Sequence, residues 1–469
     1  MIYLVIILAF ILRLVNLNQS LWLDEAVQAI TAQKSLGYIF QEIKGDFHPP
    51  LYHFLMHFWT RIFGFSEVAL RLPSIFFGVA TVYFLYLIAK LLTKSQKLSL
   101  VIALLLATAP FHIYYSQEAR MYALVTLLAT GSMYFFFKTL KQKKPQIKNS
   151  TALAYFVFTL LALYADYYAF LVLLVQAIIL LLKKKVKLLL IFCLFFLLYL
   201  PWLPMLLTQL KTGFLATQAL PEWGRLVNLS FLKALPLTFV KFSLGRITIF
   251  NKTLYTALAG GLALIYGYFL SKALKQKQVF LWLLVPLAIS WLISALIPNY
   301  QPFRLLLVLP AFYLLLALGI GKTKNFRVQV GAFILVILVN LFGLLTYYFN
   351  PYFHREDWRG AVYFLNRQQK ATVILPSEIS SWPIEYYDPK SQLNLITASK
   401  GIKVVGAEPQ LALQTKKVYF IRYLVDLFDP GERILKSLES QGYSKIKEIS
   451  FNQIPLWEFE KEDFYADWH

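Results

Sequence analysis

The sequence predicts an all-α polytopic membrane protein that ends in a small α/β domain outside the membrane. Hydrophobic residues make up 58% of the 469 residues and charged residues only 15%, far from the balance of a soluble domain. Apolar runs of about 15–22 residues recur between Ile2 and Phe349, which is membrane-spanning length for a helix. After Asn350 the composition becomes soluble in character. We therefore expect a membrane domain at residues 1–349 and an extracytoplasmic domain at residues 350–469.

The apolar runs predict about eleven membrane-spanning helices. We interpret the first run as a retained helix, because it lacks the basic start and the small-residue cleavage site of a signal peptide. The expected spans are residues 2–17, 68–92, 98–113, 119–137, 152–165, 167–182, 188–207, 253–271, 279–297, 304–320 and 328–349.

Basic clusters assign the two sides of the membrane. With eleven spans, every cluster falls in a loop on the same side, and the positive-inside bias makes that side cytoplasmic. The N-terminus is then cytoplasmic and the C-terminal domain extracytoplasmic, in a multi-pass protein of the cell membrane. This distribution also explains the formal charge of +22 without nucleic-acid binding. The clusters are Lys94 and Lys97; Lys138, Lys141, Lys143, Lys144 and Lys148; Lys183, Lys184, Lys185 and Lys187; Lys272, Lys275 and Lys277; and Lys322, Lys324 and Arg327.

Two outer segments are long, and the tail alternates helices with strands. Apolar residues at helical spacing predict interfacial helices at residues 25–36 and 51–63, joined by a turn at residues 45–50. Residues 208–252 are interpreted as a lid or a partly buried loop. In the tail we expect helices at residues 358–368 and 431–441, and strands at residues 372–376, 417–423, 446–451 and 456–459.

The acidic pair Asp24 and Glu25 follows the first span and is the strongest chemical signal. Carboxylates beside a bilayer are costly to desolvate, so they face water, pair with a cation or act as a base. One interpretation is helix capping, in which Asp24 begins a helix and Glu25 complements its dipole. The other assigns Asp24 as the general base for an acceptor hydroxyl, with Glu25 beside it.

His48 precedes two prolines. Each proline fixes its own φ, and Pro49 keeps His48 out of the α region, so the imidazole has little conformational freedom. A lone histidine is usually structural. Asp46 and the acidic pair upstream favour a functional role here.

Arg120 and Arg304 each open an apolar run on the outer side. A guanidinium at bilayer depth costs on the order of 3 kcal/mol unless it meets an anion, and phosphate matches its planar donors. Glu118 beside Arg120 is either a surface ion-pair partner or a substrate ligand. Glu67 and Arg71 are expected to form an i,i+4 pair.

Further polar residues on the outer side are candidates for sugar binding. Asp166 and Tyr167 lie in a tyrosine-rich cluster that is either an interfacial belt or a binding platform, and Tyr52 follows the Pro-Pro turn. The single cysteine, Cys193, excludes a disulfide framework. No cofactor is predicted with certainty. One acidic pair supplies too few ligands to argue for a divalent metal, so a metal requirement stays open.

Taken together, these motifs resemble the GT-C membrane glycosyltransferases, above all the dolichyl-phosphate-mannose protein mannosyltransferases and the lipid A aminoarabinose transferases. The resemblance covers about residues 1–320. It rests on Asp24-Glu25, on the segment from Asp46 to Leu51, on Glu67 followed by residues 71–74, and on residues 116–122. It implies a GT-C fold in which Asp24 matches the proposed base and Arg120 and Arg304 match cations near the lipid phosphate. His48 stands where aminoarabinose transferases have lysine.

The resemblance implies an inverting hexosyl- or pentosyltransferase that uses a polyprenyl-phosphate sugar in the membrane. The acceptor is a hydroxyl of a glycan, lipid or protein on the extracytoplasmic face. Two alternatives stay open: a lipid-sugar flippase or transporter, and a surface-polysaccharide polymerase or ligase. Transporters show repeat symmetry and charges near the midplane, whereas the charges here gather at one face and no repeat is visible.

Overall fold

The computed structural model describes residues 1–142, 150–219, 228–297, 299–368, 370–399, 411 and 413–461. The predicted cytoplasmic residues Lys143, Lys144 and Lys148 and the centre of the second long outer segment lie outside these ranges.

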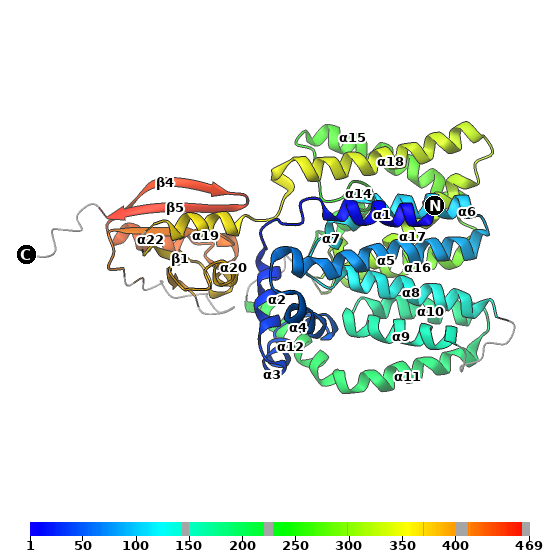
Figure 1. Cartoon of the computed structure of the whole chain (residues 1–469), viewed down its shortest axis with the longest axis horizontal. Coiled ribbons are helices and arrows are strands. Elements are labelled where there is room, and N and C mark those ends of the chain that lie inside the picture. The colour runs from blue at the N-terminus through cyan, green and yellow to red at the C-terminus, as the bar shows by residue number, and fades with distance from the viewer. Residues whose placement is uncertain are drawn as a thin grey trace, which may run out of the picture.

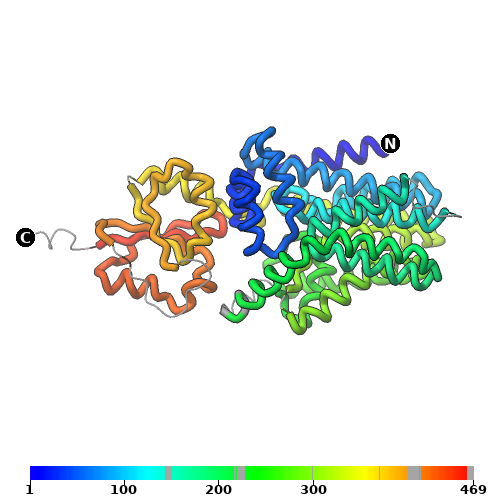
Figure 2. The backbone as a smooth tube through the Cα atoms, turned by 90° about the horizontal axis from the view of Figure 1, so that it is seen from below, coloured from blue at the N-terminus to red at the C-terminus, as the bar shows by residue number. Residues whose placement is uncertain are grey.

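The membrane domain is a bundle whose long helices run side by side, with a separate small domain beyond one end (Figures 1 and 2). Its helices are α1 (Ile2–Leu14), α5 (Glu67–Thr93), α6 (Gln96–Ala107), α7 (Pro110–Ser116), α8 (Tyr122–Leu140), α9 (Ser150–Ala165), α10 (Ala169–Leu182), α11 (Leu190–Tyr199), α12 (Leu203–Ala219), α14 (Phe231–Leu244), α15 (Lys252–Lys272), α16 (Lys277–Ile293), α17 (Leu309–Gly321) and α18 (Phe326–Phe349). The 3-10 turn η3 (Pro302–Val308) leads into α17.

Each predicted span coincides with apolar helical structure. Within the described residues, six helical segments are long and apolar enough to cross a membrane, or seven if the bent pair α6 and α7, which meet at 61°, counts as one span. Helices α1, α9, α10 and α16 are apolar but shorter. Several membrane-spanning helices are therefore confirmed, while the count of about eleven stays a prediction.

Side-chain caps and buried hydrogen bonds fix the bundle. Ser66 begins α5 by accepting a hydrogen bond from the backbone N–H of Ala69. Inside the bundle, Gln176 of α10 donates to Ser132 of α8 at 2.7 Å and accepts from Tyr155 of α9 at 2.9 Å. Such bonds join neighbouring helices where lipid offers no hydrogen-bonding alternative.

Three short helices lie at the end of the bundle that faces the small domain (Figures 1 and 2). They are α2 (Leu23–Gln33), α3 (Leu36–Glu42) and α4 (Leu51–Phe63). The predicted helices at residues 25–36 and 51–63 therefore exist, although the first ends at Gln33 and a separate α3 follows. Phe40, Phe58 and Ile62 are exposed, in keeping with helices that lie along the interface.

The second long outer segment differs from the expected loop. Its described parts are largely helical, because α12 continues to Ala219 and α14 occupies residues 231–244. Apolar residues at helical spacing continue through both parts, and the α14 interior tolerates Pro236.

The C-terminal domain contains a five-stranded mixed sheet in the order β2-β1-β3-β5-β4. The strands β2, β1 and β3 pair in parallel, and β5 pairs antiparallel with both β3 and β4. The sequence missed β2. The elements are β1 (Thr372–Leu375), β2 (Asn394–Thr397), β3 (Lys417–Ile421), β4 (Tyr443–Phe451), β5 (Ile454–Lys461), α19 (Trp358–Asn366), α20 (Trp382–Tyr387), α21 (Val425–Phe428) and α22 (Arg433–Ser440).

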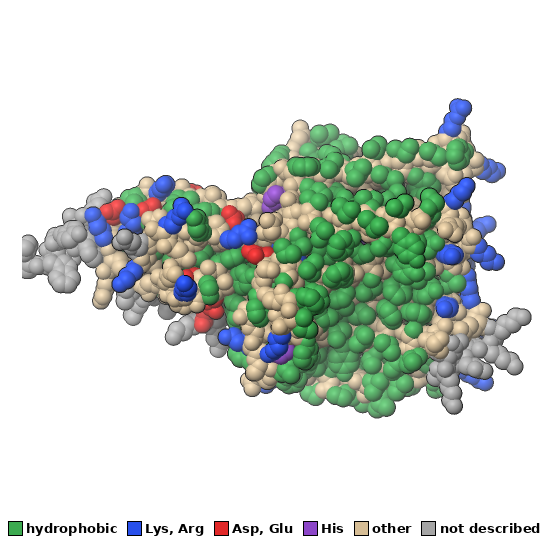
Figure 3. Space-filling view, in the orientation of Figure 1, with side chains coloured by type: hydrophobic (Ala, Val, Ile, Leu, Met, Phe, Trp, Pro, Cys, Tyr) green, Lys and Arg blue, Asp and Glu red, His purple; other side chains and the backbone are tan. Residues whose placement is uncertain are grey.

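Lysine and arginine side chains gather at the bundle end away from the C-terminal domain (Figure 3). Apolar side chains cover the flank between the two ends on the face shown. The orientation itself, with the basic end cytoplasmic and α2 to α4 on the outer side, stays a prediction from the positive-inside bias.

Candidate functional site

Asp24 and Arg120 meet at the end of the bundle that faces the C-terminal domain. Asp24 lies in the first turn of α2, and Arg120 lies in the turn between α7 and α8. An Arg120 nitrogen lies 3.7 Å from an Asp24 oxygen. The Asp24 side chain is 38% exposed and that of Arg120 only 8%. Asp24 therefore presents a carboxylate to the surface beside an almost buried cation.

Glu25 points the other way, into the protein. Its carboxylate is fully buried and binds Arg71 through two hydrogen bonds, of 2.5 and 2.9 Å. It also accepts the backbone N–H of Ala119 at 2.8 Å. Burial alone would raise the pKa of Glu25, but Arg71 and then Arg355 hold it below its usual value. Of the predicted acidic pair, only Asp24 reaches the surface.

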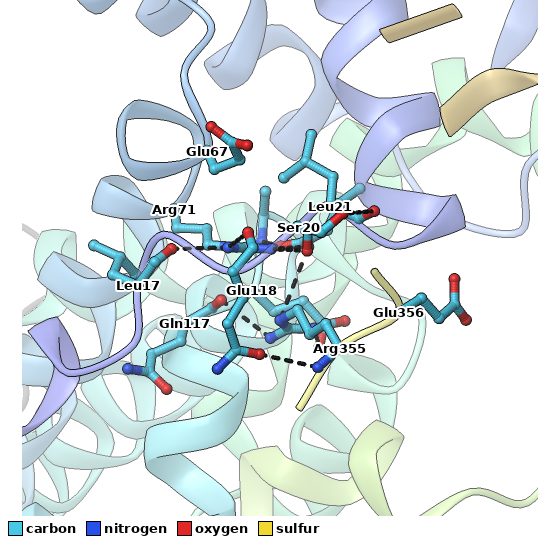
Figure 4. A network of polar contacts seen from close by, with 12 residues as sticks. Leu17, Ser20, Leu21, Glu67, Arg71, Gln117, Glu118, Arg355 and Glu356 are labelled. Carbon is cyan, nitrogen blue, oxygen red and sulfur yellow. Dashed lines mark hydrogen bonds and ion pairs between the residues drawn. The ribbon is translucent and has the colours of Figure 1, made fainter. Parts of the chain in front are cut away.

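The expected pair between Glu67 and Arg71 is wrong. Arg71 extends to Glu25 and donates to the carbonyl oxygens of Leu17, Gln19 and Ser20 at 2.6–3.0 Å (Figure 4). Glu67 instead pairs with Arg359 of the C-terminal domain at 3.1 Å. Helical spacing permits an i,i+4 pair, but the chain that leads into α2 supplies more acceptors to Arg71.

Arg355 links the C-terminal domain to the same network, which the sequence did not reveal. Its Nη1 lies 3.0 Å from Glu118, its Nε lies 3.9 Å from Glu25, and it donates to the Gln117 carbonyl at 3.0 Å (Figure 4). Burial raises the pKa of Glu118, and Arg355 opposes this rise. Glu118 is therefore paired across the chain with Arg355 and is itself buried.

His48 and His53 hold Asp46 from two sides. The imidazole Nδ1 of His48 lies 2.8 Å from one Asp46 oxygen, and Nε2 of His53 lies 2.9 Å from the other. Burial alone would raise the pKa of Asp46, but the charge and hydrogen bond of His48, the hydrogen bond of His53 and the charge of Arg120 hold it well below its usual range. The rigid Pro49-Pro50 turn thus places His48 within the charged region around Arg120.

Asp166 and Arg304 complete this region. Asp166 is buried in the turn between α9 and α10 and accepts the backbone N–H of Tyr168 at 2.8 Å. Burial raises the pKa of Asp166; His48, the Tyr168 backbone N–H, Arg304 and Arg120 oppose that rise. The predicted residues therefore lie in one electrostatic neighbourhood. We call it the rim cluster, defined by Asp24, Asp46, His48, Arg120, Asp166 and Arg304.

Both arginines of the rim cluster keep donor capacity. Arg304 donates to the Asn299 carbonyl at 3.4 Å. Among the described residues, the Nε atoms of Arg120 and Arg304 are buried without a hydrogen-bond partner. Buried donors of this kind are favourable contacts for an anion.

Two predicted sugar-binding residues are more enclosed. The Tyr52 hydroxyl lies 3.5 Å from that of Ser74 inside the protein. Tyr167 hydrogen-bonds to Gln209 and accepts from the Trp202 indole at 3.1 Å, so its hydroxyl faces the α11–α12 region. Their assignment to substrate binding stays a prediction.

A cavity of about 570 Å³ lies between this end of the bundle and the C-terminal domain. Tyr114 and Tyr122 line it from the bundle, Arg246 from the end of α14, and Glu356 and Gln453 from the C-terminal side. The sequence did not reveal this cavity, because its lining comes from segments far apart in the chain. Among the described residues, no group of three or more His, Cys, Asp or Glu side chains is arranged to hold a metal ion.

A helical bundle, short helices at one of its ends, a rim of acids and arginines, and a small C-terminal domain are the features on which the predicted resemblance to GT-C membrane glycosyltransferases is tested. A model of the family described as dolichyl-phosphate-mannose-protein mannosyltransferase matches residues 47–207. The family resemblance expected from the sequence is thus confirmed over these residues, and the chain is a multi-pass membrane protein.

Two solved structures are similar along nearly the whole chain. ArnT from Cupriavidus metallidurans, in the apo state, aligns with a TM-score of 0.57 at 10% identity, over 97% of this chain and 96% of that one. The Archaeoglobus fulgidus oligosaccharyltransferase, in complex with zinc and sulfate, aligns with a TM-score of 0.55 at 13% identity, over 95% and 72%. These identities establish a shared fold. A comparison with curated proteins finds no match.

Proposed function

We propose that the chain transfers a sugar, hexosyl or pentosyl, from a polyprenyl-phosphate donor to an acceptor hydroxyl on the extracytoplasmic face, with inversion at the anomeric carbon. The observation that carries this proposal is the partly exposed Asp24 carboxylate beside the nearly buried Arg120. The solved structures support the donor class. ArnT has been crystallised with undecaprenyl phosphate, and the archaeal enzyme AglB has been solved with a dolichol-phosphate and an inhibitory peptide.

In this mechanism Asp24 takes the proton of the acceptor hydroxyl. The acceptor oxygen bonds to the anomeric carbon as the bond from that carbon to the phosphate oxygen breaks, and the carrier leaves as polyprenyl phosphate. Negative charge then grows on the phosphate, where fixed cations lower the barrier. The carrier phosphate is already a good leaving group, so no strong acid is needed.

The rim cluster supplies these cations. Arg120 and Arg304 bind the phosphate through donors that the protein leaves unused, and His48 assists from the Pro-Pro turn. Glu118, Tyr52, Asp166 and Tyr167 are proposed to contribute to substrate binding. Glu25 acts by positioning, because its bonds to Arg71 and Ala119 fix the first turn of α2 and hence Asp24.

The test uses the full-length protein in lipid nanodiscs with a panel of polyprenyl-phosphate sugars and a set of glycan, lipid and peptide acceptors. Release of carrier phosphate reports transfer. Asp24→Asn is expected to lower release by about 10²–10⁴-fold, the usual contribution of a general base. The protein is expected to stay folded and inserted, as judged by monodisperse elution.

Asp426→Asn is the matched control, because Asp426 is an exposed acid in the C-terminal domain. Wild-type turnover in Asp24→Asn would remove Asp24 from the base role. In proteoliposomes, movement of intact donor across the bilayer without carrier release would instead identify a flippase. With polyprenyl-diphosphate sugars supplied as separate donors, release of a lipid diphosphate would identify a polymerase or ligase.

A further inference from the structure

The cavity carries positive charge that its own acids do not neutralise. Arg246 is exposed to the cavity, and among the described residues neither Arg246 nor Lys241 forms an ion pair with a carboxylate. Arg246 donates to the Tyr114 hydroxyl at 2.7 Å, and Lys241 donates to the Arg246 carbonyl at 3.2 Å. Gly245 has a φ of 79°, a conformation that favours glycine, and ends α14 so that Arg246 reaches the cavity.

The acids in the lining are already occupied. Glu118 pairs with Arg355 at 3.0 Å. Glu356 accepts from the Trp358 indole at 2.8 Å and from the Tyr423 hydroxyl at 2.9 Å. Burial also raises the pKa of Glu356. The side of the cavity next to α14 therefore offers an anion two basic side chains, Arg246 and Lys241, that hold no carboxylate at ion-pair distance among the described residues.

Aromatic rings form much of the remaining wall. The Tyr114 ring lies between two guanidinium groups, with Arg246 at 4.7 Å and Arg355 at 4.6 Å from its centroid. Tyr115, Tyr122 and Phe303 pack edge to face or tilted against one another beside it. Aromatic faces and hydroxyls suit a sugar ring, and about 570 Å³ lies within the range of small-molecule pockets.

The cavity also borders the rim cluster. Trp22 and Tyr122 line the cavity, and each stands two residues from a member of the cluster, Asp24 and Arg120 respectively. Phe303, another lining residue, directly precedes Arg304. One side of the cavity thus adjoins the proposed base, and Arg246 and Lys241 supply its charge from α14.

We propose that this cavity is the acceptor site and that the acceptor is a sugar-containing molecule bearing a phosphate or carboxylate group. Arg246 and Lys241 hold the anion, the aromatic wall holds the ring, and the reacting hydroxyl points toward Asp24. His354, Arg355, Glu356 and Gln453 line the cavity from the C-terminal side, so that domain takes part in acceptor selection. The assignment of the bound molecule as an acceptor rests on the proposed function. The existence of a site that binds an anionic sugar does not, and binding measurements alone can test it.

The experiment measures binding without catalysis. Full-length protein in nanodiscs is titrated with glucose 6-phosphate, glucuronate, glucose and inorganic phosphate, and affinity is read by isothermal titration calorimetry. We expect the two charged sugars to bind at least tenfold more tightly than glucose. Inorganic phosphate is expected to bind more weakly than glucose 6-phosphate, because it lacks the ring.

Variants assign the binding to the cavity. Arg246→Gln, and separately Lys241→Gln, is expected to lower affinity for the charged sugars at least fivefold and to leave glucose unchanged. Arg367→Gln is the matched control, since Arg367 also stacks on a tyrosine, Tyr363 at 4.3 Å, but lies outside the cavity lining. Equal affinity for glucose and glucose 6-phosphate, or no effect of either cavity variant, would overturn the proposal.

Competition with undecaprenyl phosphate tests whether the cavity binds the acceptor's anionic group or the phosphate of the lipid carrier. We expect it to leave glucose 6-phosphate binding unchanged, because the donor occupies the rim cluster. Competition that Arg246→Gln relieves would assign the cavity to the carrier phosphate and end the acceptor assignment. Absence of carrier release from every donor, with Arg246-dependent binding intact, would count against the proposed function alone.

Discussion

Two neighbouring carboxylates begin α2, and the regions around them differ in how firmly cations hold them. Around Glu25 lies a closed network in which Arg71, Arg355 and Glu118 are all buried and bonded at 2.5–3.0 Å. Around Asp24 lies the rim cluster, where the nearest cation is 3.7 Å away and the carboxylate is partly exposed. Adjacent residues thus differ in role: Glu25 is fixed in a buried ion-pair network, whereas Asp24 is accessible to a substrate.

The difference shows how the site is built. A base must keep a free lone pair, so its surroundings cannot satisfy it fully. Its position must nevertheless be fixed, and the Glu25 network fixes it by joining the entry to α2, the helix α5, the turn after α7 and the C-terminal domain. We expect substitutions in the network to change stability and substitutions in the rim cluster to change turnover.

Glu25→Gln is expected to give the largest loss of stability. It leaves Arg71 buried without its counter-charge, and breaking a buried ion pair costs about 3–5 kcal/mol. The free energy of unfolding, measured by chemical denaturation in nanodiscs, should fall by that amount, whereas Asp24→Asn should change it little. Equal stability of the two variants would erase the distinction between the regions.

Arg355→Gln tests the arm of the network that comes from the C-terminal domain. The loss of its hydrogen bonds to Glu118 and to the Gln117 carbonyl should cost about 1.5–3 kcal/mol. Limited proteolysis should also cut more readily between α18 and α19, because the domain is less firmly held. Arg359→Gln, which removes the more exposed pair with Glu67, is the control and should cost under about 1 kcal/mol.

Much of this architecture was predictable from the sequence. Apolar runs located the helices, because a segment of that length and composition has few other stable states in lipid. The spacing of Asp24, His48, Arg120 and Arg304 on the outer side predicted a shared site, and the structure brings them together with Asp166. The strand β2 was missed because only four residues form it, and none of them is fully buried.

What the sequence could not give is the pairing of charges across long separations. Arg71 pairs with Glu25 and not with Glu67, because the segment before α2 also offers carbonyl oxygens to the Arg71 guanidinium. Arg355 lies beyond the last span, so nothing local connects it to Glu118, and Arg246 looked like one more scattered basic residue. Such partners depend on how helices pack, which local periodicity does not encode.

Within the rim cluster, Arg120→Ala and Arg304→Ala should each raise the donor KM about tenfold, since a hydrogen bond to a charged group is worth roughly 1.5 kcal/mol or more. Arg120→Lys should recover part of this loss, because it keeps the charge and loses the planar donors. Initial rates of carrier release over a range of donor concentrations give the values. An unchanged donor KM in both alanine variants would contradict the phosphate assignment.

Asp46→Asn should have the smallest effect on stability. The pH dependence of that effect shows whether the charge of the Asp46 carboxylate stabilises the fold. Because the folded pKa of Asp46 is held below the unfolded value of about 3.9, the carboxylate contributes stability above that value and loses it as pH falls further. The gap in thermal midpoint between wild type and Asp46→Asn should therefore narrow as pH falls from 7 toward 3. Asp426→Asn, at an exposed carboxylate of the C-terminal domain, is the control. A difference in thermal midpoint that stays constant with pH would mean that the charge of Asp46 does not stabilise the fold. The turn that carries His48 would then not belong to the rim cluster electrostatically.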